Sequence, residues 1–189
     1  MQNLRKMIAS LGVVAIISTL VVSTAVAGAF NDVPEDHWAY SYVEDLAALG
    51  VFDSENDAFN PGVPMSRAGY VKTVVEAAGL EGTTEISFPD VAEDAWYYDV
   101  VATGVANGII GGYEDGTFGP DDSLTREQAA KIAVLGFDME EMLPEEASFP
   151  DVADDRWSYG FVETLVAYGV INGYEDGTFG PEDKFFVSK

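Results

Sequence analysis

The chain has 189 residues, and 33 Asp and Glu against nine Lys and Arg give it a formal net charge of −24. So few cations exclude nucleic acid as the default partner, because phosphate binding needs a clustered basic surface. Hydrophobic residues make up 48% and aromatic residues 12%, which favours a folded core over an acidic disordered tail, and the absence of cysteine excludes disulfides, thiolate metal sites and cysteine nucleophiles.

The first predicted element is a secretory signal peptide over residues 1–27. Arg5 and Lys6 precede an apolar run over residues 7–22, and Ala25 and Ala27 occupy the two positions that signal peptidase reads. An uncleaved membrane anchor is the alternative, but the run is short for a span of about 20 residues. We therefore expect export, cleavage after Ala27 and no membrane contact afterwards.

Three copies of one unit follow the signal peptide. They open with Phe-x-Asp-Val and a Trp at residues 30–38, 88–96 and 149–157, at offsets of 58 and then 61 residues. The sequence Gly-Tyr-Glu-Asp-Gly-Thr-Phe-Gly-Pro at residues 112–120 recurs at residues 173–181, and the first copy keeps a degraded version at residues 53–61. A fixed period of this size is typical of a repeat architecture.

Each complete copy is predicted to form a helix, a long turn and a second helix. After each Trp, apolar residues at +4, +5 and +9 form one helical face, and Gly50, Gly108 and Gly169 suit the end of that helix. The Asp of Phe-x-Asp-Val is expected to cap or orient the turn into this first helix. The second helix opens at Ser66 and Thr125, and Thr125 forms a capping box with the glutamine three residues on.

These elements predict an all-α fold of tandem helix-loop-helix repeats. We expect the copies to span residues 28–86, 87–147 and 148–189, with linkers near residues 79–87 and 136–148. The third copy lacks a second helix, since Phe186 and Val187 stand where the second copy has Thr125 and Arg126. A repeat without that helix leaves apolar surface uncovered, so we expect a longer protein or completion by another chain or fold.

The motif order resembles the S-layer homology (SLH) module, present as a tandem of three. The resemblance rests on Phe-x-Asp-Val with Trp, a first helix ending in Gly, Gly-Tyr-x-Asp-Gly-Thr-Phe and then Leu-Thr-Arg-Glu. It implies repeats packed around a pseudo-threefold axis and non-covalent anchoring of exported proteins to the cell wall. The implied ligand is a pyruvylated secondary wall polysaccharide or a related peptidoglycan-linked polymer, held in grooves between repeats.

The resemblance also implies the residues that bind this polymer. An Arg at the start of the second helix is the principal contact, and the Asp and Trp of the first segment help to build the groove. The candidate ligand-binding residues are Arg126, Thr125, Glu127, Arg67, Ser66, Asp90, Trp96, Asp151, Trp157, Asp32 and Trp38. The sequence departs from the family in two places. In the first copy, Gly69 stands where the family has an acidic residue, and the third copy has no Thr-Arg.

The chemistry of these side chains fits an anionic sugar. A guanidinium at a helix N-terminus offers a carboxylate charge-assisted hydrogen bonds, and the exposed amides and the helix dipole add to them. The alternative for Arg67 and Arg126 is a structural salt bridge with a neighbouring acid. For the three Trp residues, core packing is the favoured interpretation, with groove lining as a secondary role.

Three other functions compete with wall binding. The only histidine is His37 and carboxylate pairs are common throughout, so no catalytic residue is predicted. The Tyr-Glu-Asp-Gly-Thr-Phe loop lacks the alternating ligands of a calcium-binding EF-hand, and no metal or cofactor is expected. Self-assembly with other S-layer subunits is the remaining alternative, together with an anchor whose enzymatic or porin cargo lies beyond the chain. The predicted location is the cell wall or S-layer of the cell envelope.

Overall fold

The computed structural model describes residues 28–52 and 58–186, so the predicted signal peptide and part of the degraded loop of the first copy lie outside it. It contains helices α2 (Tyr40–Ala48), α3 (Arg67–Ala77), α4 (Tyr98–Ala106), α5 (Arg126–Gly136) and α6 (Tyr159–Ala167). Two isolated β-bridges and no strand occur within these ranges, which confirms the predicted all-α class. None of the described helices is long and apolar enough to cross a membrane.

The described chain divides into two compact units, and the smaller one contains α2. This unit runs to Pro64 and includes Phe186. Its core consists of Phe30, Val33, Ala39 and Val43, with the aromatic rings of Phe52 and Phe59 packed against them. The predicted first helix of the first copy is therefore present and buries one apolar face.

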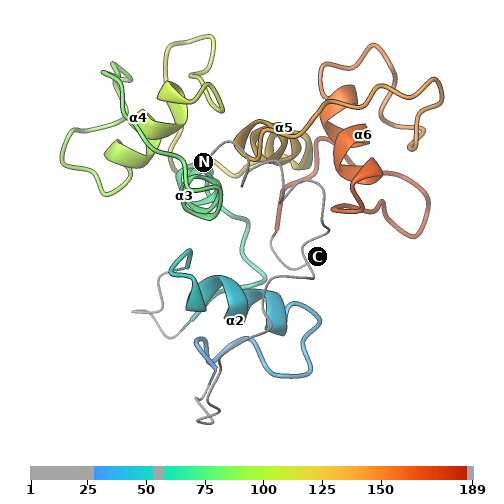
Figure 1. Cartoon of the computed structure of the whole chain (residues 1–189), viewed down its shortest axis with the longest axis horizontal. Helices are drawn as coiled ribbons and strands as arrows, with labels where there is room; N and C mark the ends of the chain where they lie inside the picture. Colours follow the sequence, from blue (N-terminus) through green and yellow to red (C-terminus); the bar gives the residue numbers. More distant parts are fainter. Residues whose placement is uncertain (1–27, 53–57, 187–189) are drawn as a thin grey trace. The chain divides into compact units, whose positions relative to one another are not determined.

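The larger unit, Met65–Phe185, contains the other four helices. In it α3 packs against α4, α5 packs against α6, and α3 also contacts α5 (Figure 1). One core joins Val71 and Val74 of α3 to Val101 of α4. A second core joins Val134 of α5 to Val162 of α6. The second helix of one copy thus buries its apolar face against the first helix of the next copy, so the packing unit spans the junction between repeats.

A ring of three hydrogen bonds connects the three copies inside this unit. Its members, Met65, Leu124 and Phe185, hold the same repeat position. Met65 N donates to Phe185 O at 3.2 Å, Phe185 N donates to Leu124 O at 2.8 Å, and Leu124 N donates to Met65 O at 3.4 Å. Since each copy donates once and accepts once, the ring has the local pseudo-threefold arrangement that the resemblance implies.

The predicted helix ends agree with the structure. Gly108 and Gly169 follow α4 and α6 with φ of +70° and +68°, a left-handed conformation that favours glycine. At the start of α5, Thr125 Oγ1 accepts from Gln128 N, and Gln128 Oε1 accepts from Thr125 N, which completes the capping box. Ser66 caps α3 in the same way by accepting from Gly69 N. These local signals begin and end the helices at the observed positions.

Two adjacent glycines in the loop after α4 are expected to respond differently to alanine. A Cβ on Gly112 would lie 2.6 Å from Phe88 Cε1 and 2.9 Å from Thr117 O, whereas a Cβ on Gly111 meets nothing within 4 Å. Gly112→Ala should lower the free energy of unfolding by about 1–3 kcal/mol, because the Phe88 ring is packed in the core and the Thr117 carbonyl belongs to the backbone. Gly111→Ala should be neutral or slightly stabilising. Urea denaturation measures both, and equal effects would contradict the prediction.

Candidate functional site

The first candidate arginine, Arg67, begins α3 and reaches into the loop of the second copy. Its Nη2 donates to Gly111 O at 2.8 Å. The guanidinium carbon lies 5.0 Å from the Tyr113 ring centroid and 4.9 Å from that of Phe118. The residue is only 7% exposed, and its Nε is buried with no hydrogen-bond partner among the described residues. Burial lowers the pKa of Arg67 from its usual value, because the charged form loses solvation.

The second candidate, Arg126, begins α5 and makes the equivalent contacts one copy later. Its Nε donates to Phe179 O at 2.7 Å and its Nη2 to Asn172 O at 3.4 Å. The guanidinium carbon lies 4.8 Å from the Tyr174 ring centroid and 4.4 Å from that of Phe179. Arg126 is half-buried, so it is more accessible than Arg67. Each arginine therefore joins a second helix to the Gly-Tyr-Glu-Asp-Gly-Thr-Phe loop of the following copy.

Neither guanidinium forms an ion pair with a carboxylate in the described part of the chain, although Asp122 lies near enough to Arg67 to oppose the lowering of its pKa by burial. The ion pairs found there are Lys72–Glu76, Arg156–Glu127 and Arg156–Glu182. The alternative of a structural salt bridge at Arg67 or Arg126 is therefore not what the structure contains. Backbone carbonyls and aromatic rings take the place of the acid, although acids are plentiful in this sequence.

The amides at the helix N-termini are already engaged, so the expectation that they are exposed to a ligand is wrong. Arg126 N donates to Asp183 O at 2.9 Å, and Glu127 N donates to Pro181 O at 3.1 Å. The third amide is satisfied by the Thr125 cap. The first two amides of α3 are satisfied in the same way, by Asp122 O and Pro120 O. A ligand at either junction would meet the guanidinium group and not the amides of the helix end.

The aspartates of the Phe-x-Asp-Val motifs have a different role from the predicted helix cap. The Asp90 carboxylate accepts from Phe118 N at 2.8 Å and from Gly119 N at 2.7 Å, across 28 and 29 residues. Asp151 does the same for Phe179 and Gly180, and Asp32 does so for Phe59 and Asn60. The N-cap residues of the first helices have no side-chain cap bond. These aspartates thus close the long turn and do not cap the helix.

The structure brings some of the predicted site residues together. At the junction between the second and third copies, the backbone of Phe179 is held at its N–H by Asp151 and at its carbonyl by Arg126. At the preceding junction Asp90 holds the Phe118 N–H, and Arg67 lies over the Phe118 ring. An arginine of one copy and an aspartate of the next therefore meet at the same Phe. Asp32 and Trp38 belong to the smaller unit and are described with it.

Stability is expected to fall in acid through Asp90. Partial burial alone would raise the pKa of Asp90, but the Phe118 and Gly119 amides outweigh it and hold that pKa below the usual 3.8. A carboxyl whose pKa is lower in the folded than in the unfolded chain stabilises the fold above pH 4, and this contribution disappears as the pH falls through the folded-state pKa. Urea denaturation at several values between pH 5 and pH 2.5 should show this decline. Asp90→Asn should make the decline in the free energy of unfolding with falling pH shallower. An unchanged decline would contradict the assignment of this pH dependence to Asp90.

The three candidate tryptophans are exposed, so the interpretation that they pack in the core is wrong. Trp38, Trp96 and Trp157 are 60%, 63% and 52% exposed. The core positions near them are filled by smaller residues such as Val91 and Val152 of the Phe-x-Asp-Val motifs. An exposed indole at the same position of every copy is available to a ligand, as the secondary role of groove lining requires.

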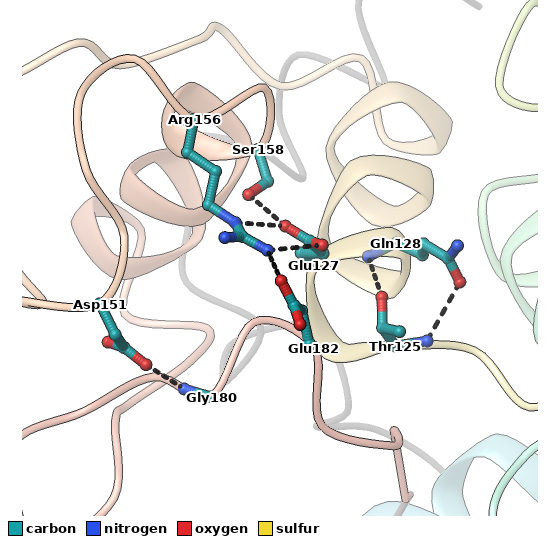
Figure 2. Close-up of polar contacts among 8 residues, drawn as sticks. All are labelled: Thr125, Glu127, Gln128, Asp151, Arg156, Ser158, Gly180 and Glu182. Atoms are coloured by element: carbon teal, nitrogen blue, oxygen red, sulfur yellow. Dashed lines mark hydrogen bonds and ion pairs between the residues drawn. The ribbon is translucent and has the colours of Figure 1, made fainter.

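A buried polar network that the sequence did not predict fixes the start of α5 against the third copy. Glu127 is 5% exposed, and its carboxylate accepts from Arg156 Nε at 2.8 Å, Arg156 Nη2 at 3.0 Å and Ser158 Oγ at 2.7 Å (Figure 2). Arg156 also donates to Glu182 at 3.0 Å. The hydrogen bonds that Arg156 donates to the two glutamates raise the pKa of Arg156 above its usual value. Glu127, named as a ligand residue, is therefore committed to a bidentate structural pair.

The preceding junction carries no such network. Ala68, Ala95 and Tyr97 occupy the positions of Glu127, Arg156 and Ser158. The glutamate and the arginine are thus both replaced by alanine, and the serine is replaced by tyrosine. The compared positions are 59 residues apart for Glu127 and 61 residues apart for Arg156 and Ser158. Once the packing across the junction is known, this joint difference between the copies is the sequence signal that identifies the network.

Comparison with known proteins agrees with the order of the repeats. The family described as S-layer homology domain matches residues 29–68, 87–130 and 148–185. Among similar proteins are the Surface-layer 125 kDa protein of Lysinibacillus sphaericus (36% identical over 90% of the chain) and the Cellulosome-anchoring protein of Acetivibrio thermocellus (29% identical over 70% of it). An Endoglucanase of Bacillus sp. (strain KSM-635) is 28% identical over 81% of the chain. The chain spans 15%, 30% and 17% of the lengths of these three relatives.

Proposed function

Because the chain belongs to the S-layer homology family, we propose that it anchors an exported protein non-covalently to the cell wall. Its ligand in this proposal is an anionic, pyruvylated wall polysaccharide, or a related peptidoglycan-linked polymer, bound at the junctions between successive copies. The observation that carries the proposal is the pair of equivalent guanidinium groups at Arg67 and Arg126, neither of which forms an ion pair with a described residue of a chain with net charge −24.

Each guanidinium lies in a cage of two aromatic rings and a backbone carbonyl: Tyr113, Phe118 and Gly111 O form the Arg67 cage, and Tyr174 and Phe179 with its carbonyl form the Arg126 cage. The chemistry of these two cages supports an anionic ligand. Pyruvate linked as a ketal carries a carboxylate, and a guanidinium binds that group through two parallel hydrogen bonds. Arg126 uses its Nε and one terminal nitrogen on backbone carbonyls and is half-buried, and its other terminal nitrogen donates to no described residue. Arg67 is almost enclosed. We therefore assign the principal contact to Arg126 and a lesser one to Arg67, with Trp96 offering an apolar face to a sugar ring.

A location at the cell surface fits this role. One relative is named for the surface layer and another for the anchoring of the cellulosome. The proposed module is not itself an enzyme, since the endoglucanase relative is matched over only 17% of its own length and the chain has a single histidine, His37. Other S-layer subunits are a further candidate partner, through contacts between copies of the chain.

Co-sedimentation with purified wall sacculi tests the proposal. The parent chain should bind sacculi that retain their acidic polymer and should not bind sacculi from which hydrofluoric acid has removed it. Arg126→Ala should weaken binding roughly tenfold, as expected for loss of a charge-assisted contact. Lys72→Gln removes a charge whose partner is Glu76 on the same helix, so it serves as the matched control. Circular dichroism verifies that each variant is folded.

Two outcomes would contradict the proposal. One is equal binding by folded Arg126→Ala and the parent, which would leave the guanidinium with a structural role alone. The other is sedimentation of the parent without sacculi, which would favour self-assembly of the chain with its own copies.

A further inference from the structure

Trp157 is exposed but held in place. Both of its neighbours in the chain, Arg156 and Ser158, are hydrogen-bonded to the buried carboxylate of Glu127 (Figure 2). The indole itself is 52% exposed and lies 6.4 Å from the Phe161 ring centroid. An exposed aromatic ring whose backbone is fixed on both sides loses little further freedom when a ligand lies on it.

A lysine stands beside this ring. Lys131 lies one helical turn after Glu127 on the same face of α5. Its Nζ is 5.9 Å from the centroid of Trp157 and 5.9 Å from that of Phe161. The side chain is exposed and makes no ion pair with any described residue. An ammonium group that makes no ion pair with a described residue therefore lies over the two aromatic rings.

The preceding junction has the same residue types without this arrangement. Lys72 holds the repeat position of Lys131, but its Nζ pairs with Glu76 at 3.3 Å. Trp96 stands edge-on to Tyr97 at 5.2 Å, and Ala68 replaces the glutamate that fixes the segment around Trp157. The free lysine beside a fixed tryptophan is thus a feature of the junction between α5 and α6, which gives an internal control.

We propose that Trp157, Phe161 and Lys131 form a separate contact site for a carboxylate-bearing sugar residue. The indole face takes the apolar face of the sugar ring, and the ammonium group takes the carboxylate. Positions 126 and 131 are about 140° apart around an α-helix, so this site lies on a different face of α5 from the Arg126 cage. The inference rests on the proposed wall-polymer function and adds a second acidic sugar residue to it.

Co-sedimentation with sacculi that retain their acidic polymer tests the site on the mature chain. Lys131→Gln and Trp157→Ala should each weaken binding roughly three- to tenfold, and Lys72→Gln should bind as the parent does. Trp157→Phe should restore most of the loss, because it keeps an aromatic face. If the parent chain does not bind the sacculi, the proposed function is refuted. If the parent binds and both Lys131→Gln and Trp157→Ala match it, this site alone is refuted.

Tryptophan fluorescence gives a readout that folding alone does not move. A Trp38→Phe/Trp96→Phe variant retains Trp157 as its one tryptophan. Titration with the soluble acidic polymer released from the sacculi should change its emission, and adding Lys131→Gln should shift the midpoint to higher concentration. The same polymer with its pyruvate groups removed by mild acid should give a weaker response. Equal responses to the two polymers, or an emission that does not change, would overturn the inference.

Discussion

Replacing Glu127 with alanine is expected to lower the free energy of unfolding by about 3 kcal/mol. The carboxylate is 5% exposed and accepts three hydrogen bonds from Arg156 and Ser158. Its removal leaves the guanidinium with Glu182 alone, whose side chain is 79% exposed, and leaves the buried Ser158 hydroxyl without its acceptor. Urea denaturation followed by circular dichroism measures the change.

The preceding junction supplies the control for this variant. Because Ala68 and Ala95 stand there in place of Glu127 and Arg156, Glu127→Ala/Arg156→Ala should recover part of the lost stability by removing the unpaired cation. Glu127→Gln should fall between the parent and Glu127→Ala, since its amide oxygen still accepts from Ser158. A loss below about 0.5 kcal/mol in Glu127→Ala would mean that the network contributes nothing to stability.

The helices could be predicted from the sequence because their signals are local. A capping box at Thr125, a left-handed Gly108 after α4 and apolar residues at helical spacing each act within a few residues. The pairing of these helices could not be predicted in the same way, because α3 packs against the next copy and not within its own. The long-range bonds of Asp90 to residues 28 and 29 positions away illustrate the same limit.

The sequence predicted where the candidate arginines lie along the chain but not the geometry around them. The repeated arginines do lie at the junctions, yet their helix amides are occupied by loop carbonyls such as Asp183 O. Burial of an indole was expected from its size, but valines of the same motifs fill the core and leave Trp157 exposed. Nothing in the sequence marks Lys131 as a site residue, because it is a single exposed lysine. Only the packing of α5 against α6 places it near that ring.

Phe118→Ala is expected to cost about 4 kcal/mol, the largest loss predicted for a single substitution in this chain. Phe118 is fully buried, its ring lies 5.7 Å from that of Phe88, and its N–H is held by Asp90. Truncation leaves a cavity that this fixed backbone cannot close, and it removes one wall of the Arg67 cage. Phe118→Leu, which fills most of the volume, should lose only about 1 kcal/mol in urea denaturation. A loss under 1 kcal/mol for the alanine variant would show that the loop, and with it the guanidinium cage, is not fixed by this ring.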